Sequence, residues 1–464
     1  MAAKILTVDN PYSGIPYVEL PLASVEEAAA TVKRAAAAQK EWAKVPVAER
    51  VKLVGRFVEA FLSMKEQVAK DITGMMGKPL GQARGEVDTL AARSRYMASV
   101  AEESLAEVPL PQVANFHRKV VREPVGVVLV IAPWNYPLLT AVNAVVPAIL
   151  AGNSVVLKHA ARTPLCGEHF ARAFEKAGAP KDLVQAIHCD HATCATMIAR
   201  PEVGFVNFTG SVPGGHQIYE QTAKRFIDAG LELGGKDPGY VAADADFDHA
   251  VENLVDGAFY NAGQSCCGIE RIYVHQSLYP RFVDAATALV KKYVLGDPTD
   301  AATTLGPLAQ PGSDQFIARQ IAEAKQKGAR ILCGGSAIQV NGKGRFLDPC
   351  VVADATHAMS VMVEESFGPV VGIAPVKDDE EAIRLMNDSP YGLTCAIWTA
   401  DEARAERMAH RLETGTVFMN RCDYLDPALP WVGVKDSGKG LSLSKWGFHA
   451  VTRLKSLHFR LKTK

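Results

Sequence analysis

Residues 124–157 decide the fold: PVGVVLVIAPWNYPLLTAVNAVVPAILAGNSVVL. The stretch carries no charged residue and is long enough to cross a bilayer. Residue types that end or interrupt helices divide it, however, at Pro133, Pro137, Pro147 and Gly152-Asn153. The pieces predict a buried strand, a turn, a short helix and a second buried strand. The stretch is therefore typical of an α/β core and not of a membrane span.

The chain repeats this alternation as far as residue 235. Short apolar segments predict strands, and amphipathic segments between them, such as residues 164–180, predict helices. The expected strands cover residues 153–160, 182–189, 204–210 and 231–235. Alternation of this kind predicts a parallel sheet with helices on both faces, which binds ligands at the carboxyl ends of its strands. A second α/β run lies between residues 238 and 420, so the fold class is α/β.

An N-terminal helical region leads into a ribbon-like segment. Ser24 and Glu27 form a capping-box pattern at the start of the first helix, and helical periodicity continues to residue 72. Residues 108–126 then alternate between apolar and polar side chains within proline boundaries, which predicts a protruding hairpin. Residues 453–462 alternate as well, and we expect them to pair with this ribbon near Lys119.

The composition excludes several classes of function. The 464 residues carry a formal net charge of -1, with 48% hydrophobic and 22% charged residues, so neither nucleic acid nor a membrane is an expected partner. The nine cysteines follow no disulfide spacing, and no CxxC or HExxH pattern indicates a metal site. The sequence begins without a secretory signal pattern, so we expect a reduced, cytoplasmic protein whose cysteines are mostly core residues.

Three segments carry side chains suited to ligand binding or chemistry. Gly210 and Gly214 follow an expected strand, and Ser211 between them could cap a helix whose amide groups face a phosphate. Glu232 ends another expected strand directly before two glycines, where a carboxylate is either a rim charge or a base. Asn135 lies between two prolines in a rigid turn, where its side chain could either take part in function or simply cap the turn.

A fourth segment places two cysteines side by side in FYNAGQSCCGIER, residues 259–271. A reactive thiolate here would need backbone amides or a nearby cation to lower its pKa. The alternative for either cysteine is a small side chain packed in the core. Local pattern alone leaves open which of Cys266 and Cys267 matters.

Taken together, these segments resemble the NAD(P)-dependent aldehyde dehydrogenase superfamily over nearly the whole chain, and its bacterial succinate-semialdehyde dehydrogenase-like members in particular. The decisive combination is a strand-end carboxylate before Gly-Gly-Lys, followed further along the chain by Gly-Gln-x-Cys. The matching segments are residues 133–137 (PWNYP), 208–211 (FTGS), 231–236 (LELGGK), 263–266 (GQSC), 364–370 (EESFGPV) and 387–393 (NDSPYGL).

The resemblance implies a reaction and the residues that carry it out. Cys266 would attack a small-molecule aldehyde and form a thiohemiacetal, with the Asn135 amide and the Cys266 backbone N–H as oxyanion donors. Transfer of hydride to the cofactor would leave a thioester. Glu232 would then activate the water that hydrolyses this thioester to a carboxylic acid. Cys267 would be a packing neighbour or a redox-protective thiol.

The implied cofactor is NADP or NAD, bound by a parallel-sheet, Rossmann-like domain. The family's organisation would place the NAD(P)-binding domain at residues 1–105 and 125–234 and the α/β catalytic domain at residues 235–435. A small β oligomerisation element would comprise residues 106–124 and 436–464, and we expect a homo-oligomer, either a dimer or a tetramer. The expected cofactor contacts are Trp134, Lys158, Gly210, Ser211, Gly214, Leu233, Glu365 and Phe367.

Three departures from the family pattern affect the details. Many NAD-preferring relatives carry a glutamate where this chain has Ala161, so we expect good use of NADP, with Lys158 near its phosphate and Arg162 exposed. Relatives often have Gly-Arg-Glu where residues 440–442 are Gly-Leu-Ser, so a second carboxylate is missing. Succinate-semialdehyde dehydrogenases tend to carry an arginine at the position of Asn143. Because this helix has no cation, we expect an uncharged aliphatic or aromatic aldehyde, with succinate semialdehyde as the alternative.

Three rival functions lead to different expectations. Coenzyme A-acylating relatives commonly lack the base, whereas Glu232 is present here. A non-catalytic structural protein on the same fold would have lost Cys266, Glu232 or Asn135, and all three remain. A cysteine hydrolase without a nucleotide would cause no change in NAD(P) absorbance when an aldehyde is added. The sequence therefore favours oxidation of an aldehyde to a free acid.

Overall fold

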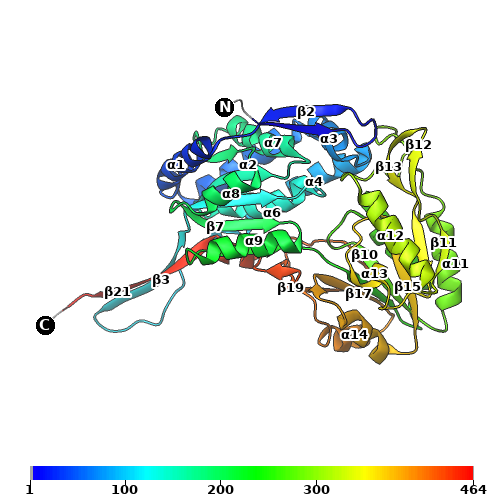
Figure 1. Ribbon diagram of the computed structural model, residues 1–464. Coiled ribbons are helices and arrows are strands. Elements are labelled where there is room, and N and C mark those ends of the chain that lie inside the picture. The colour runs from blue at the N-terminus through cyan, green and yellow to red at the C-terminus, as the bar shows by residue number, and fades with distance from the viewer. Residues whose placement is uncertain (1–3, 463–464) are drawn as a thin grey trace.

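Two β-sheets with helices on their faces form the body of the protein, and a long two-stranded ribbon extends from it (Figure 1). The computed structural model describes residues 4–462. Parallel strands dominate both sheets, which confirms the predicted α/β class. The division into domains at particular residues stays a prediction.

The first sheet has six strands in the order β20-β8-β7-β4-β5-β6. Only the short edge strand β20 is antiparallel to its neighbour. The strands are β4 (Val127–Ala132), β5 (Ser154–His159), β6 (Val184–Ala186), β7 (Val203–Thr209), β8 (Asp228–Glu232) and β20 (Gly438–Lys439). The helices of this part of the chain are α1 (Val25–Trp42), α2 (Val47–Leu62), α3 (Lys65–Met76), α4 (Leu80–Ser99), α5 (Ala101–Leu105), α6 (Pro137–Leu150), α7 (Pro164–Lys176), α8 (His191–Ile198) and α9 (Val212–Ala223).

The second sheet has seven strands in the order β11-β14-β15-β10-β9-β17-β18, with β11 antiparallel at one edge. The strands are β9 (Asp237–Val241), β10 (Ile269–His275), β11 (Arg330–Cys333), β14 (Cys350–Ala353), β15 (Val370–Val376), β17 (Thr394–Trp398) and β18 (Thr416–Met419). Its helices are α10 (Phe247–Phe259), α11 (Tyr279–Val290), α12 (Ser313–Gln326), α13 (Ser360–Val363), α14 (Asp379–Asn387) and α15 (Glu402–Ala409). Short two-stranded pairs complete the fold: β1 (Ile5–Asp9) with β2 (Pro16–Pro21), β12 (Ala337–Val340) with β13 (Lys343–Leu347), and β16 (Tyr391–Gly392) with β19 (Val434–Lys435).

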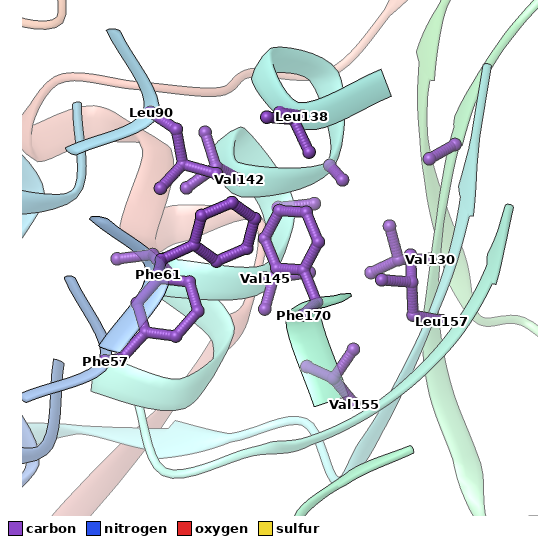
Figure 2. Close-up of a cluster of buried hydrophobic side chains, with 14 of the residues drawn as sticks. Phe57, Phe61, Leu90, Val130, Leu138, Val142, Val145, Val155, Leu157 and Phe170 are labelled. Carbon is purple, nitrogen blue, oxygen red and sulfur yellow. The ribbon is translucent and has the colours of Figure 1, made fainter. Parts of the chain in front are cut away.

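The stretch at residues 124–157 folds as predicted, into β4, the turn that contains Asn135, α6 and β5. Helix α6 is apolar on nearly all sides because it is buried on nearly all sides. Figure 2 shows Phe61 and Phe170 facing Val142 and Val145 of this helix. The rings of Phe57 and Phe174 stack behind them, with centroids 4.1 Å apart. Aromatic packing of α2 and α7 therefore holds α6 against the sheet.

The first helix begins as the capping-box pattern predicts. The Ser24 hydroxyl accepts a hydrogen bond from the Glu27 N–H at 3.2 Å, and the Glu27 carboxylate accepts one from the Ser24 N–H at 2.7 Å. Among residues 4–462, no helix is both long and apolar enough to cross a membrane.

The ribbon is built from two distant segments, β3 (Phe116–Pro124) and β21 (Thr452–Arg460). Lys119 pairs with Leu457, which confirms the predicted pairing of the C-terminal segment with the ribbon. The prediction of a hairpin within residues 108–126 was wrong in part. Residues before β3 form only isolated bridges, such as that between Val108 and Val120, because β21 takes the place of a hairpin partner.

Candidate active site

A cavity of about 290 Å³ lies among residues contributed by both sheet regions. Helices α4 and α6 line one part of it, and α10, the loop before β10 and residues 422–425 line another. Cys266 and Glu232 both face this cavity, so the structure brings the two together as expected. A second cavity, of about 600 Å³, follows the carboxyl ends of β4, β5 and β7. Thr209 lines both cavities, and the two therefore adjoin.

The loop that carries Cys266 is fixed by its own hydrogen bonds and by a glycine. Asn261, Ala262 and Gly263 have φ values of 53°, 55° and 67°, a run of left-handed backbone that turns the chain out of α10. A Cβ atom at Gly263 would lie 2.2 Å from the Gly368 carbonyl oxygen, so only glycine is accommodated. The buried Gln264 side chain donates to the Asn261 carbonyl at 3.1 Å and accepts from the Ala309 N–H at 2.9 Å.

Cys267 differs from Cys266 in burial and in its partner. Its side chain is 4% exposed, and its thiol donates a hydrogen bond to Asp423 Oδ1 at 3.0 Å. The Ser265 hydroxyl donates to the same oxygen at 3.2 Å. The hydrogen bond with Cys266, burial and the charge of Asp423 raise the pKa of the Cys267 thiol well above its ordinary value. Burial raises the pKa of the Asp423 carboxyl to about 6.

Glu232 ends β8 and is held by a serine from a distant part of the chain. The Ser442 hydroxyl donates to Glu232 Oε1 at 2.5 Å, and Ser442 is 4% exposed. Burial raises the pKa of the Glu232 carboxyl, and the bond from Ser442 partly opposes this rise. Ser442 lies at the position where relatives often carry a second carboxylate. In this chain it supplies a hydrogen-bond donor instead.

A buried ion pair holds the Asn135 backbone in place. Lys78 Nζ donates to Glu86 Oε2 at 2.5 Å and to the Asn135 carbonyl at 2.9 Å. Glu86 Oε1 also accepts from the Leu138 N–H at the start of α6. The Asn261 side chain donates to the Asn135 carbonyl at 3.1 Å and so joins this turn to the loop that precedes Cys266. Within the described part of the chain, Tyr136 lines the cavity, whereas Asn135 itself is not one of the lining residues.

The second cavity has the features of a nucleotide site. Four of the expected contacts line it: Trp134, Lys158, Gly210 and Ser211. Lys158 is 6% exposed, and its ammonium group donates a hydrogen bond to the His159 carbonyl oxygen at 3.4 Å. Ser211 caps α9 by accepting from the Gly214 N–H, and residue 213 is a proline without an N–H, so Val212 is the first-turn residue whose amide can meet a phosphate. A buried ammonium group beside a helix N-terminus fits the hydroxyl and phosphate groups of a dinucleotide.

The remaining expected contacts lie next to this lining rather than in it. Glu365 Oε1 accepts from the Gly235 N–H at 2.9 Å, and burial raises the pKa of the Glu365 carboxyl to about 7. The Phe367 ring meets Trp134 edge-on, with centroids 5.4 Å apart. A Cβ atom at Gly215 would lie 2.6 Å from Leu233 Cδ1, which places Leu233 against the first turns of α9. Gly214 donates its N–H to the Ser211 hydroxyl at 3.4 Å.

Two expectations from the sequence need correction. Arg162 is not exposed: it is 8% accessible, pairs with Asp9 and donates to the Met75 carbonyl at 2.6 Å. These bonds take up its guanidinium group, so it is no free cation for a phosphate. Helix α6 has no cation, as the sequence indicated, but the expectation of an uncharged aldehyde considered this helix alone, and Arg93 of α4 lines the same cavity.

Sequence reasoning missed several residues of the site because their partners are remote in the chain. Asp423 lies 156 residues from the thiol that it binds, and Ser442 lies 210 residues from Glu232. The one local signal for the contact between Asp423 and Cys267 was that Asp423 lies in a polar loop, MNRCDYLDP at residues 419–427. Arg93 stands in an ordinary amphipathic helix and gave no signal.

Comparison with known proteins identifies the relatives of this chain. A model of the aldehyde dehydrogenase family matches residues 2–457. A succinate semialdehyde dehydrogenase of Escherichia coli (strain K12) that uses NAD(P)+ is 34% identical over 448 residues, which cover 97% of this chain and 96% of the relative. The chloroplastic betaine aldehyde dehydrogenase of Beta vulgaris is 33% identical over 464 residues, with coverage of 97% and 92%. A solved point mutant of the betaine aldehyde dehydrogenase from Staphylococcus aureus, in complex with NAD+, has a TM-score of 0.94 at 32% identity and covers 99% and 95% of the two chains.

Proposed function

The chain belongs to the aldehyde dehydrogenase family, and we propose that it oxidises an aldehyde to a free carboxylic acid with NADP or NAD. The observation that carries this proposal is the arrangement of Cys266 and Glu232 in one cavity, which adjoins a second cavity with Lys158 and Ser211. A cysteine hydrolase would have no need of the second cavity. A coenzyme A-acylating enzyme would have no need of a carboxylate held beside the nucleophile.

In the first half of the proposed reaction, the Cys266 thiolate attacks the aldehyde carbon and forms a thiohemiacetal. Hydrogen bonds of Gln264 hold the loop that carries the Cys266 backbone N–H, and Lys78 holds the Asn135 backbone; the Cys266 N–H and the Asn135 side-chain amide are the proposed donors to the oxyanion. Bound NAD(P) would supply the two-electron acceptor that oxidation of the thiohemiacetal to a thioester on Cys266 requires. The Phe367 ring packs edge-on against Trp134, which lines the second cavity.

In the second half, Glu232 takes a proton from the water that attacks the thioester, and the acid leaves as Cys266 regains its thiolate. The raised pKa of Glu232 makes it a stronger base than an exposed carboxylate. Ser442 keeps one carboxylate oxygen occupied, so the other is directed to the water. The roles proposed here for Asn135, Glu232 and Cys266 are those that the family resemblance implies.

The cysteine pair gives the central test. We expect Cys266→Ser to reduce NAD(P)-dependent oxidation of an aldehyde by roughly 10³-fold or more, because a hydroxyl is a far weaker nucleophile than a thiolate. The matched control Cys267→Ser keeps most of the activity, since Cys267 serves Asp423 and not the substrate. The measurement is the rise in absorbance of the reduced cofactor. An essential Cys267 with a dispensable Cys266 would contradict the assignment.

Ser442 gives a test of the base. Glu232 acts in its ionised form, so turnover falls as the pH drops through its raised pKa. Ser442→Ala removes a bond that lowers this pKa, and the acid limb of the kcat profile should therefore move to higher pH. Ser437→Ala, in the same segment but bonded to the Gly234 carbonyl, should leave the limb in place. A limb that stays still or moves to lower pH in Ser442→Ala would remove Ser442 from this role.

Cofactor choice is proposed to include NADP, because Ala161 lines the second cavity and presents no carboxylate to a 2′-phosphate. Lys158 is the nearby charge that suits such a group. We expect Ala161→Glu to shift the ratio of kcat/KM toward NAD by about 1–3 kcal/mol, the usual range for a close charge or hydrogen-bond change. Wild-type protein that ignores NADP, or a ratio that Ala161→Glu leaves unmoved, would refute the argument.

The ribbon of β3 and β21 is proposed to bind a second copy of the chain in a homodimer, which a tetramer could contain twice. A two-stranded ribbon is marginal alone, and Leu454, Phe459 and Leu461 on it are 64%, 53% and 65% exposed. We expect a dimer or tetramer by analytical ultracentrifugation at micromolar concentration, weakened by Phe459→Lys. Ile15→Lys, at a 65% exposed site between β1 and β2, is the control. A wild-type monomer would overturn this proposal.

A further inference from the structure

Arg93 of α4 is a buried cation in the wall of the catalytic cavity. Its side chain is 5% exposed, and Nη1 donates to Asn143 Oδ1 at 3.1 Å and to the Leu139 carbonyl at 3.2 Å. Both acceptors are neutral. The Nε atom is buried without a hydrogen-bond partner. Within residues 4–462, nearby carboxylates act on Arg93 only through the longer-range field, and none forms an ion pair with it.

The carboxylates around Arg93 already have partners of their own. Glu86 is paired with Lys78 and accepts from the first amides of α6. Glu232 accepts a hydrogen bond from Ser442, and no hydrogen bond or ion pair between Glu232 and Arg93 forms among the described residues. Asp423 accepts from Cys267 and Ser265. Arg93 is therefore a desolvated charge without a counter-charge, an arrangement that is costly unless a ligand supplies one.

We propose that Arg93 binds an anionic group at the far end of the substrate, so that the preferred substrates are short aldehydes that also carry a carboxylate. The planar guanidinium matches a carboxylate in geometry, and Asn143 and Leu139 orient it from α6. Arg93 and Cys266 line the same cavity, so one small substrate could present its aldehyde to the thiol and its carboxylate to the guanidinium group. This inference rests on the proposed function and names the substrate class of the same site.

A positively charged aldehyde is the main competitor, because Asp256 of α10 also lines the cavity. The Asp256 side chain is exposed to solvent, although the protein atoms around its carboxyl group desolvate it partly and raise its pKa. Water can solvate an exposed carboxylate that has no protein partner, but it cannot solvate the buried guanidinium group of Arg93 in the same way. The substitution Asp256→Asn therefore serves as the matched control, since it removes a charge from the same cavity without touching Arg93.

The experiment compares three aldehydes with saturating cofactor: succinate semialdehyde, pentanal and trimethylammonioacetaldehyde. In the wild type we expect kcat/KM to be highest for succinate semialdehyde. Arg93→Met should reduce the ratio of its kcat/KM to that of pentanal about 10- to 100-fold, the usual effect of losing a charge-assisted hydrogen bond. Arg93→Lys should retain part of the preference, and Asp256→Asn should leave this ratio in place.

Inhibition of pentanal oxidation provides a readout that needs neither turnover of a charged aldehyde nor a substituted protein. Succinate should compete with pentanal for the wild type, and butanoate, which lacks the second carboxylate, should compete at least about 10-fold more weakly. Equal inhibition by the two acids, equal use of succinate semialdehyde and pentanal, or a preference for trimethylammonioacetaldehyde that Asp256→Asn abolishes would each overturn the inference. Oxidation of pentanal in those cases would leave the proposed function standing, whereas a wild type that oxidises no aldehyde would refute the proposed function itself.

Discussion

The close approach of the two sheets at Gly234 and Gly235 is the constraint on which the site depends. The chain leaves the first sheet at Glu232 and enters the second at Asp237, so these glycines form the crossing between them. A Cβ atom at Gly235 would lie 2.2 Å from the Cys266 carbonyl oxygen, and one at Gly234 would lie 2.6 Å from Glu365 Oε2. Any side chain here would push the Cys266 loop or Glu365 away from this crossing. The absence of two side chains thus brings Cys266, Glu232 and Glu365 together.

Buried ion pairs position the backbone around this crossing. Lys78 and Glu86 hold the Asn135 turn and the start of α6, and the Lys236–Glu270 pair holds the amides of residues 366–367. In both pairs the carboxylate accepts backbone N–H groups as well as the lysine, which satisfies the lone pairs that burial would otherwise leave unpaired. Removal of one partner of such a pair typically costs about 3–5 kcal/mol. Arg93 differs from these cations because its partners are neutral.

The sequence predicted what local pattern determines. The β4–α6–β5 unit, the capping box at Ser24 and the pairing of Lys119 with the C-terminal strand follow from periodicity and composition. Motif resemblance supplied Cys266 and Glu232, which the fold then placed in one cavity. The contacts of Asp423, Arg93 and Arg162 could not be predicted, because each is decided by packing between segments far apart in the chain. A long polar side chain in a helix has the same local pattern whether its end meets water or a cavity.

The two adjacent cysteines show how packing separates residues that the sequence leaves equivalent. Cys267 points to a carboxylate, and its hydrogen bond with Cys266, its burial and the charge of Asp423 together oppose loss of the thiol proton, so Cys267 remains a hydrogen-bond donor. Cys266 is the less buried of the two, its backbone meets the Gly235 crossing, and it lines the cavity. Asp423 therefore acts on Cys267. In the proposed reaction this contact leaves Cys266 as the sulfur that attacks the aldehyde.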